Sequence, residues 1–351
     1  MSIQELLSET ARLDASDLHI IVGFPPTARI VGKLTPIANT KAVTPKDAEE
    51  FIYAILPPEQ KEIFLANKEC DFSFSTAVGR FRANIYYQRG AIAAAFRLIP
   101  ARIRTIEQLG LPQILYEFTK LRQGFVLLTG PTGEGKSTTL AAMIGHINQT
   151  RALHVITIED PIEYVYPVGL SLISQREMHA DTHSWSMALR SALREDPDVV
   201  LVGEMRDYET IAAALTIAET GHLVFATLHT NSASQTIDRI VDVFPENQQS
   251  QIRLQLANTI EGVVSQRLVP ALAGGRIAVC EVMTGIPAVK SIIRDGKTNQ
   301  LDNVIMTSSE YNMATLETSL AKAVTEGKIS VEVASSYAFR PDELGRMIKR
   351  A

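Results

Sequence analysis

The sequence of 351 residues is poor in cysteine and in long hydrophobic runs. Its two cysteines, Cys70 and Cys280, are too few and too far apart for a disulfide framework or a four-thiolate zinc site. Its longest apolar runs, such as residues 125–128, fall far short of the ~20 residues that a membrane-spanning helix needs. The first residues lack the basic start and apolar block of an export signal. These absences favour a cytoplasmic protein that reaches a membrane, if at all, through a partner.

Charge of neither sign is in strong excess, because 34 Lys and Arg against 39 Asp and Glu leave a formal net charge of −5. A mildly acidic surface gives no general attraction to nucleic acid, and the sequence shows no obvious basic track that could supply one. Hydrophobic residues make up 46% and charged residues 21%, a balance that excludes wholesale disorder. The length favours two domains over one.

The first hundred residues have the pattern of a small mixed domain. Helical spacing covers residues 2–12 and 45–66, and strand-like stretches cover residues 17–22, 70–75, 80–88 and 91–99. A segment bounded by prolines follows and is the expected linker between domains. We therefore predict a first domain of residues 1–99, a linker of residues 100–112 and a second domain of residues 113–351.

The second domain alternates short apolar runs with longer helical patterns. The strands that we expect are Gly124–Thr129, His154–Glu159, Val199–Val202 and residues 223–227. Such alternation predicts an α/β fold with a mainly parallel sheet covered by helices. Beyond about Pro245 the pattern becomes helical, with residues 248–268 the longest run and residues 313–326 another.

A glycine-rich segment follows the first of these strands. It consists of Gly130, Pro131, Thr132, Gly133, Glu134, Gly135, Lys136 and Ser137, followed by Thr138, and it has the spacing of a Walker A phosphate loop. Glycines let consecutive backbone N–H groups point at phosphate oxygens, and the positive end of the following helix adds to them. Lys136 is expected to reach the β- and γ-phosphates, and the Ser137 hydroxyl to bind Mg²⁺. We therefore expect ATP and Mg²⁺ as ligands.

Glu134 is unusual in this loop, because it places a carboxylate beside a site for a polyanion. Two interpretations stay open. In the first, which we favour, the side chain points outward, toward solvent or a neighbouring subunit, where water and salt screen its charge. In the second, it tunes or impairs nucleotide binding.

Acidic and histidine side chains stand near the ends of the other predicted strands. They are Glu159, Asp160 and Glu163 after the second strand, Glu204 after the third, and His222 and His229 on either side of the fourth. In open parallel sheets, ligands lie outside the carboxyl ends of the strands. We therefore expect the acids near the phosphates, where one can hold Mg²⁺ and another can orient or deprotonate the attacking water. His229 could contact the γ-phosphate, whereas His222 is expected to be structural.

The order of these motifs resembles the secretion-ATPase superfamily of type II and type IV secretion and pilus motors. The matching segments are residues 15–20, the phosphate loop, and residues 158–163, 194–204, 220–231 and 292–300. The similarity covers essentially the whole chain and looks most like the retraction ATPases of type IV pili. Pilus-extension relatives carry an additional N-terminal region and a four-cysteine metal site, and this chain shows neither.

The resemblance implies an N-terminal PAS-like α+β domain, a RecA-like P-loop ATPase domain with a helical C-terminal part, and nucleotide between the two. It implies that Glu163 is the general base and that Glu204 is the Walker B acid near Mg²⁺, which it holds with Ser137, in part through water. Which of the two carboxylates is the base stays open. His229 would contact the γ-phosphate. The family also uses N-terminal arginines against the phosphates, and the positions that we identify are Arg82 and Arg97, with Arg104 less favoured.

The function that the resemblance implies is an ATP-driven, homo-hexameric motor for pilus retraction and twitching motility. It would lie at the inner face of the cytoplasmic membrane, act on an inner-membrane platform protein, and dismantle pilin indirectly, without a nucleic-acid partner. The alternatives are an accessory retraction paralogue, an export ATPase of the same superfamily, a low-turnover regulatory subunit and a RecA-type nucleic-acid translocase. His179 and His183 could also share a helical face as metal ligands, although a polar loop is the favoured interpretation of that segment.

Overall fold

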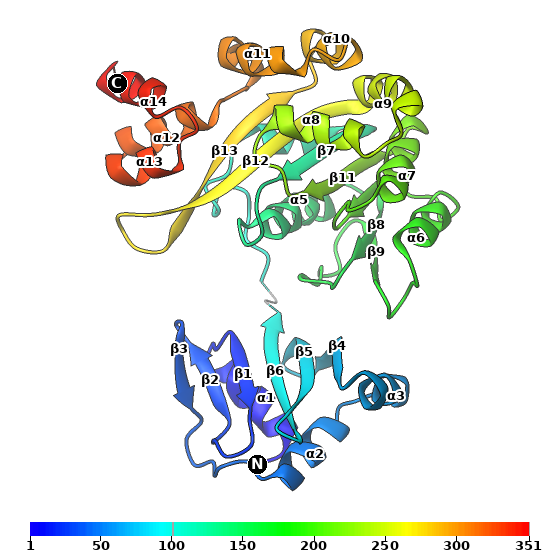
Figure 1. Ribbon diagram of the computed structural model, residues 1–351, viewed down its shortest axis with the longest axis vertical. Helices are drawn as coiled ribbons and strands as arrows, with labels where there is room; N and C mark the ends of the chain where they lie inside the picture. The colour runs from blue at the N-terminus through cyan, green and yellow to red at the C-terminus, as the bar shows by residue number, and fades with distance from the viewer. Residues whose placement is uncertain (100–101, 351) are drawn as a thin grey trace. The chain divides into compact units, whose positions relative to one another are not determined.

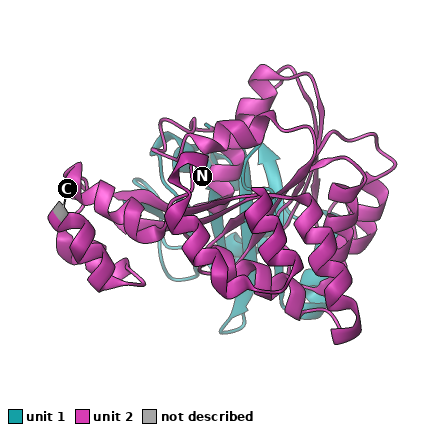
Figure 2. Ribbon diagram, turned by 90° about the horizontal axis from the view of Figure 1, so that it is seen from above, with its two compact units in different colours: residues 1–102, 161–165 teal, residues 103–160, 166–351 magenta. Residues whose placement is uncertain are grey.

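The computed structural model describes residues 1–99 and 102–350, and the chain forms two compact units (Figures 1 and 2). The first unit is Met1–Arg102 with Pro161–Val165, and the second is Ile103–Asp160 with Tyr166–Ala351. The short segment Pro161–Val165 thus groups with the first unit, although its neighbours on both sides along the chain belong to the second.

The boundary between the units differs from the expected linker of residues 100–112. Pro100 and Ala101 lie outside the described residues. From Ile103 onward the chain packs with the second unit, because Ile106 and Leu111 are buried in one hydrophobic cluster with Leu115. Two apolar side chains that lose their contact with water hold the segment there.

The first unit contains one antiparallel sheet with the strand order β3-β2-β1-β6-β5-β4. Its elements are α1 (Ile3–Arg12), β1 (Asp17–Ile20), β2 (Thr27–Ile30), β3 (Lys33–Pro36), α2 (Pro45–Tyr53), α3 (Pro58–Asn67), β4 (Glu69–Thr76), β5 (Gly79–Gln88) and β6 (Ala91–Ile99). Side chains alternate across the sheet with a period of two, so Phe81, Ala83 and Ile85 of β5 enter the core while Arg82 and Asn84 stay exposed.

The helix expected over residues 45–66 is two helices. Thr44 caps α2 in a reciprocal capping box with Asp47, as the Thr-Pro start indicates. Pro57 and Pro58 then interrupt the chain, because proline lacks the N–H that a continuing helix would donate, and α3 begins at Pro58. The short strands β2 and β3 were not expected from the sequence.

In the second unit, the sheet has the order β13-β12-β7-β11-β10-β8-β9, in which β13 pairs antiparallel to β12 and the other pairings are parallel. Its strands are β7 (Gly124–Thr129), β8 (His154–Glu159), β9 (Leu172–Glu177), β10 (Val199–Val202), β11 (Leu223–Leu228), β12 (Ile260–Pro270) and β13 (Arg276–Thr284). The four predicted strands are confirmed as β7, β8, β10 and β11, and so is the predicted α/β fold class.

Helices cover both faces of this sheet (Figure 1). The helices are α4 (Ile114–Lys120), α5 (Lys136–Thr150), α6 (Trp185–Ala192), α7 (Tyr208–Glu219), α8 (Ala233–Asp242), α9 (Glu246–Thr259), α10 (Pro287–Arg294), α11 (Leu301–Thr307), α12 (Leu316–Thr325), α13 (Val331–Tyr337) and α14 (Pro341–Arg350), with short 3₁₀ turns at Thr298–Gln300 and Ser309–Tyr311. Strand β7 is buried along its whole length: Phe125 and Leu127 pack in one cluster with α7 and α9, and Val126 and Leu128 in another with α4 and α5.

The expected helix over residues 248–268 is wrong beyond Thr259. There α9 ends and Ile260 starts β12, which lies between β7 and β13 in the sheet. Tertiary pairing overrides the local helical spacing, because β12 pairs with β7 as far as Ser265 and with β13 from Gly262 to Pro270. Gly262 marks the entry, since a Cβ atom there would lie 2.2 Å from the Phe118 ring.

The C-terminal helices α12, α13 and α14 have a small core of their own. It includes Leu316, Leu320 and Leu344 and is completed by Val269 of β12 and Val279 of β13. Figure 1 shows these helices beside the two strands. The expected helix over residues 313–326 is α12. Among the described residues, no helix combines the length and apolar character needed to cross a membrane.

Candidate functional site

The phosphate loop connects the end of β7 to the start of α5, in the strand–loop–helix context that the motif requires. Gly130, Gly133 and Gly135 have φ angles of 139°, 82° and 81°, which side chains with a Cβ atom rarely adopt. At Gly130 a Cβ atom would also lie 2.4 Å from the carbonyl oxygen of Gln266. The loop therefore winds tightly. The N–H groups in the first turn of α5 face the centre of the loop, which is the arrangement that phosphate binding requires.

Lys136 lies inside this loop with 8% of its surface exposed. Its Nζ donates to the carbonyl oxygens of Gly130 at 2.7 Å and Pro131 at 2.9 Å. The same Nζ lies 3.4 Å from Nδ1 of His229, which follows β11. The ammonium group thus lies inside the loop, and the residue that follows β11 contacts it.

Glu204 follows β10 and joins this group. Its Oε1 lies 2.9 Å from Nε2 of His229, and its Oε2 accepts a hydrogen bond from Nη2 of Arg206 at 2.8 Å. Burial works against ionisation, but the Arg206 hydrogen bond and the charge of His229 outweigh it, so the pKa of Glu204 lies below its usual value. The carboxylate is therefore ionised at neutral pH, and its oxygens suit Mg²⁺.

Arg206 was not identified from the sequence. Its hydrogen bond to Glu204 raises the pKa of its guanidinium, so the pair stays charged. The sequence offers only a cation two residues after the Walker B acid, and this spacing by itself does not predict an ion pair.

The remaining acids have different surroundings. Glu159 Oε1 accepts from Oγ1 of Thr157 at 2.6 Å and from Nε2 of Gln175 at 3.2 Å, so neighbouring side chains of β8 and β9 hold it. Asp160 contributes to the electrostatic environment of Arg206. Glu163 lies in Pro161–Val165, which groups with the first unit, and its role as base stays a prediction.

The expected arginines of the first unit are both paired with carboxylates. Arg82 and Arg97 stand opposite each other on β5 and β6. Arg82 makes a two-nitrogen contact with Asp71, and Nε of Arg97 donates to Oδ1 of Asp17 at 2.9 Å. Arg104 lies on an exposed segment of the second unit. Contact of any of the three with phosphate stays a prediction.

Glu134 does not point outward, so the interpretation that we favoured is wrong. Its side chain is half-buried, and Oε2 accepts a hydrogen bond from the backbone N–H of Leu268 on β12. The sequence could not show this contact, because it required β12 to be a strand. Ser137 and Thr138 lie in the first turn of α5. The Ser137 hydroxyl, together with the Glu204 carboxylate that follows β10, offers the kind of oxygen ligand that Mg²⁺ prefers.

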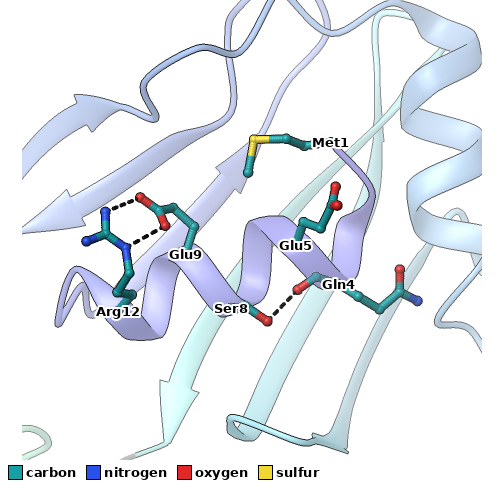
Figure 3. Close-up of a pocket in the computed structure, with 6 residues that line it drawn as sticks. All are labelled: Met1, Gln4, Glu5, Ser8, Glu9 and Arg12. Carbon is teal, nitrogen blue, oxygen red and sulfur yellow. Dashed lines mark hydrogen bonds and ion pairs between the residues drawn. The ribbon is translucent and has the colours of Figure 1, made fainter.

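Two other features do not compete with this site. Residues 178–183 are not helical, because the N–H of His179 donates to the carbonyl of Thr182, so His179 and His183 do not share a helical face. Within the described ranges, no group of three or more His, Cys, Asp or Glu side chains could hold a metal ion. A hollow on the surface of α1 is lined by Met1, Gln4, Glu5, Ser8, Glu9 and Arg12 (Figure 3). Arg12 pairs there with Glu9, and Ser8 donates to the carbonyl oxygen of Gln4, but the hollow has no phosphate loop.

Comparisons with known proteins agree with this geometry. Residues 95–283 match the family model described as type II/IV secretion system protein. The chain is 47% identical to the type IV pilus retraction ATPase PilT of Pseudomonas aeruginosa, over 97% of this chain and 99% of that protein. It is 46% identical to a twitching motility protein of Neisseria gonorrhoeae, over 96% and 90%. The solved structure of the pilus retraction motor PilT with bound ADP is similar with a TM-score of 0.92 and 45% identity, over 99% of both chains.

Proposed function

The chain belongs to the family of type II/IV secretion system proteins, and from this premise we propose that it is an ATP-hydrolysing motor that drives retraction of a type IV pilus. The observation that carries the proposal is the likeness, over nearly the whole length, to a retraction motor solved with ADP. An intact phosphate loop with a buried lysine supports the same activity, because that loop has no other common use than binding phosphate.

The chain's own residues divide the work of hydrolysis. Lys136 exchanges its bonds to the loop carbonyls for bonds to the β- and γ-phosphates, and His229 contacts the γ-phosphate while Glu204 holds its imidazole. Ser137 and Glu204 are the proposed holders of Mg²⁺, in part through water; the ion neutralises charge on the phosphates when bound. Glu163 is the proposed general base for the attacking water.

We further propose Arg82 and Arg97 as phosphate contacts. Each guanidinium is oriented by one carboxylate, and a phosphate would compete for the same fork of N–H groups. Replacing either arginine by alanine should lower ATP turnover, and unchanged turnover in both variants would remove them from the site.

The proposed assembly is a homo-hexamer in the cytoplasm, at the inner face of the membrane. Its proposed partner is the inner-membrane platform protein of the pilus, through which it would act on pilin. These assignments come from the family and rest on no described surface of this chain.

The test is complementation in Pseudomonas aeruginosa that lacks its PilT. The chain should restore twitching motility, and a Lys136→Ala variant produced at the same level should not, because it lacks the charge aimed at the phosphates. Purified wild-type chain should release phosphate from ATP. ATP turnover by the purified chain without restored twitching motility would favour an export ATPase of the same family. Negligible ATP turnover would favour a regulatory subunit.

A further inference from the structure

Strand β12 is the surface against which the phosphate loop packs. It pairs with β7 as far as Ser265 opposite Thr129, where β7 ends and the loop begins, and it continues to Pro270 paired with β13. Beyond this point the loop takes the place of β7 beside β12. A Cβ atom added to Gly135 would lie 3.0 Å from Nε2 of Gln266 and 3.5 Å from a methyl carbon of Leu268.

The side chain of Gln266 holds the loop from two directions. Its Nε2 donates to the carbonyl oxygen of Glu134 at 2.6 Å, and its Oε1 accepts from Oγ1 of Thr139 on α5 at 2.7 Å. With 2% of its surface exposed, the amide depends on these partners, because water cannot replace them. Gln266 therefore bonds to the loop backbone before Lys136 and to a side chain of α5 after it.

Glu134 adds a charged bond to the same strand. The N–H of Leu268 lies beyond the end of β7, and the carboxylate of Glu134 accepts its hydrogen bond instead. A hydrogen bond with an ionised acceptor is about twice as strong as a neutral one. The carboxylate of Glu134 is thereby directed at a backbone N–H group of β12.

We propose that Glu134 is a positioning residue for nucleotide binding: its carboxylate holds the phosphate loop on β12 and so keeps the loop's N–H groups oriented for phosphate. The proposal rests on nucleotide binding by this loop and is independent of what the motor acts upon. A loop that is held before the ligand arrives loses less conformational freedom on binding, and this raises affinity.

The experiment compares Glu134→Ala and Glu134→Gln in the full chain, with Mg-ADP as the ligand in calorimetry and Mg-ATP in steady-state turnover. Glu134→Ala removes the acceptor and should weaken Mg-ADP binding about tenfold. Glu134→Gln keeps an oxygen that can accept from Leu268 and should recover most of that loss. KM for ATP should rise in the alanine variant with kcat changed much less, because the chemical groups stay in place.

A second readout does not involve nucleotide. Hydrogen exchange of the peptide that contains Leu268 should be faster in Glu134→Ala than in Glu134→Gln. The matched control is Glu117→Ala, which removes an exposed carboxylate of α4 that pairs with Lys120 and should leave binding of Mg-ADP unchanged.

Equal affinities in the wild type and both variants would overturn the proposal. So would tighter binding by both variants, which would show that the charge of Glu134 repels the nucleotide. A wild-type chain that binds no nucleotide at all would overturn the proposed function together with this inference, and that result is distinguishable from the other two.

Discussion

At the scale of single residues, the site is a row of contacts in which each side chain orients the next. Lys136 lies against His229, His229 against Glu204, and Glu204 against Arg206. One ring nitrogen of His229, Nε2, lies 2.9 Å from Oε1 of Glu204, and the other, Nδ1, lies 3.4 Å from Nζ of Lys136. The imidazole thus lies between the lysine of the phosphate loop and the carboxylate that follows β10.

The first prediction concerns Glu204→Gln. The amide keeps the size of the side chain but loses the charge that faces His229 and that we propose to hold Mg²⁺, so ATP turnover should fall about a hundredfold while nucleotide still binds. Phosphate release and calorimetry measure the two effects separately. Lys136→Ala is the contrasting variant, since it should lose binding itself. Wild-type turnover in Glu204→Gln would show that Glu204 is not part of the chemistry.

A second prediction concerns Glu281 of β13, which is 7% exposed and accepts a hydrogen bond from the N–H of Ala233 at the start of α8. Burial raises the pKa of Glu281 from 4.5 to about 7; the nearby Asp302 and Glu317 add to the rise, whereas the Ala233 bond and Arg340 oppose it. Because the folded-state pKa lies above the unfolded value, its stabilising contribution is complete below pH 4.5 and is lost as pH rises through about 7.

The loss amounts to about 3 kcal/mol at most. Urea unfolding from about pH 5 to pH 8 should therefore show a steeper decline in the wild type than in Glu281→Gln, whose amide does not titrate. Parallel pH profiles for the two proteins would exclude this burial effect.

The sequence identified several side chains that the structure brings together, but it missed Arg206 and gave the direction of Glu134 wrongly. Glycine spacing and the positions after strands identified Lys136, Glu204 and His229, because a parallel sheet brings its carboxyl ends together. The direction of Glu134 depends on Leu268, which is 134 residues away in the sequence. No local pattern carries a contact of that separation.

At the scale of elements, buried strands were predictable and β12 was not. A run such as Val199–Val202 is apolar on both faces and permits few other structures. The residues of β12 continue the helical spacing of α9, and pairing with β7 and β13 makes them a strand. Tertiary pairing decided this element, so its neighbours in space were needed to predict it.

The third prediction uses the entry to this strand. Gly262→Ala places a methyl group 2.2 Å from a ring carbon of Phe118, which itself is buried, so the free energy of unfolding should fall by about 1–3 kcal/mol. The control is Gly345→Ala in α14, where no atom lies within 4 Å of the added methyl group. That variant should be stabilised by about 0.5–1 kcal/mol, because alanine favours helix over glycine. Urea unfolding measures both, and equal effects of the two substitutions would contradict the crowding at Gly262.

At the scale of the whole molecule, the sequence predicted two parts with different patterns, and the structure has two compact units. Resemblance to the family supplied the ring, which no periodicity or composition indicates. The inclusion of Pro161–Val165 in the first unit could not be predicted, because contacts in space define it and the segment follows β8 of the second unit directly along the chain.

The fourth prediction tests the proposed ring. Wild-type chain mixed with Lys136→Ala chain should lose more ATP turnover than the mixing ratio accounts for, because each inactive subunit would interrupt its neighbours. Sedimentation with a non-hydrolysable ATP analogue should give six times the mass of one chain. Turnover that falls in proportion to the mixing ratio would show that the subunits hydrolyse ATP independently.

Leu268 and Val269 are consecutive residues of β12 with partners in different parts of the second unit. Leu268 binds the phosphate loop through Glu134, and Val269 is fully buried among the C-terminal helices. Both residues are paired with neighbouring residues of β13, so we expect a change at Leu268 to reach Val269. Addition of ADP should therefore slow hydrogen exchange in α12, and unchanged exchange there would contradict a coupling between the phosphate loop and the C-terminal helices. Nucleotide binding at the phosphate loop would then affect the C-terminal helices through a single peptide bond, without a hinge between them.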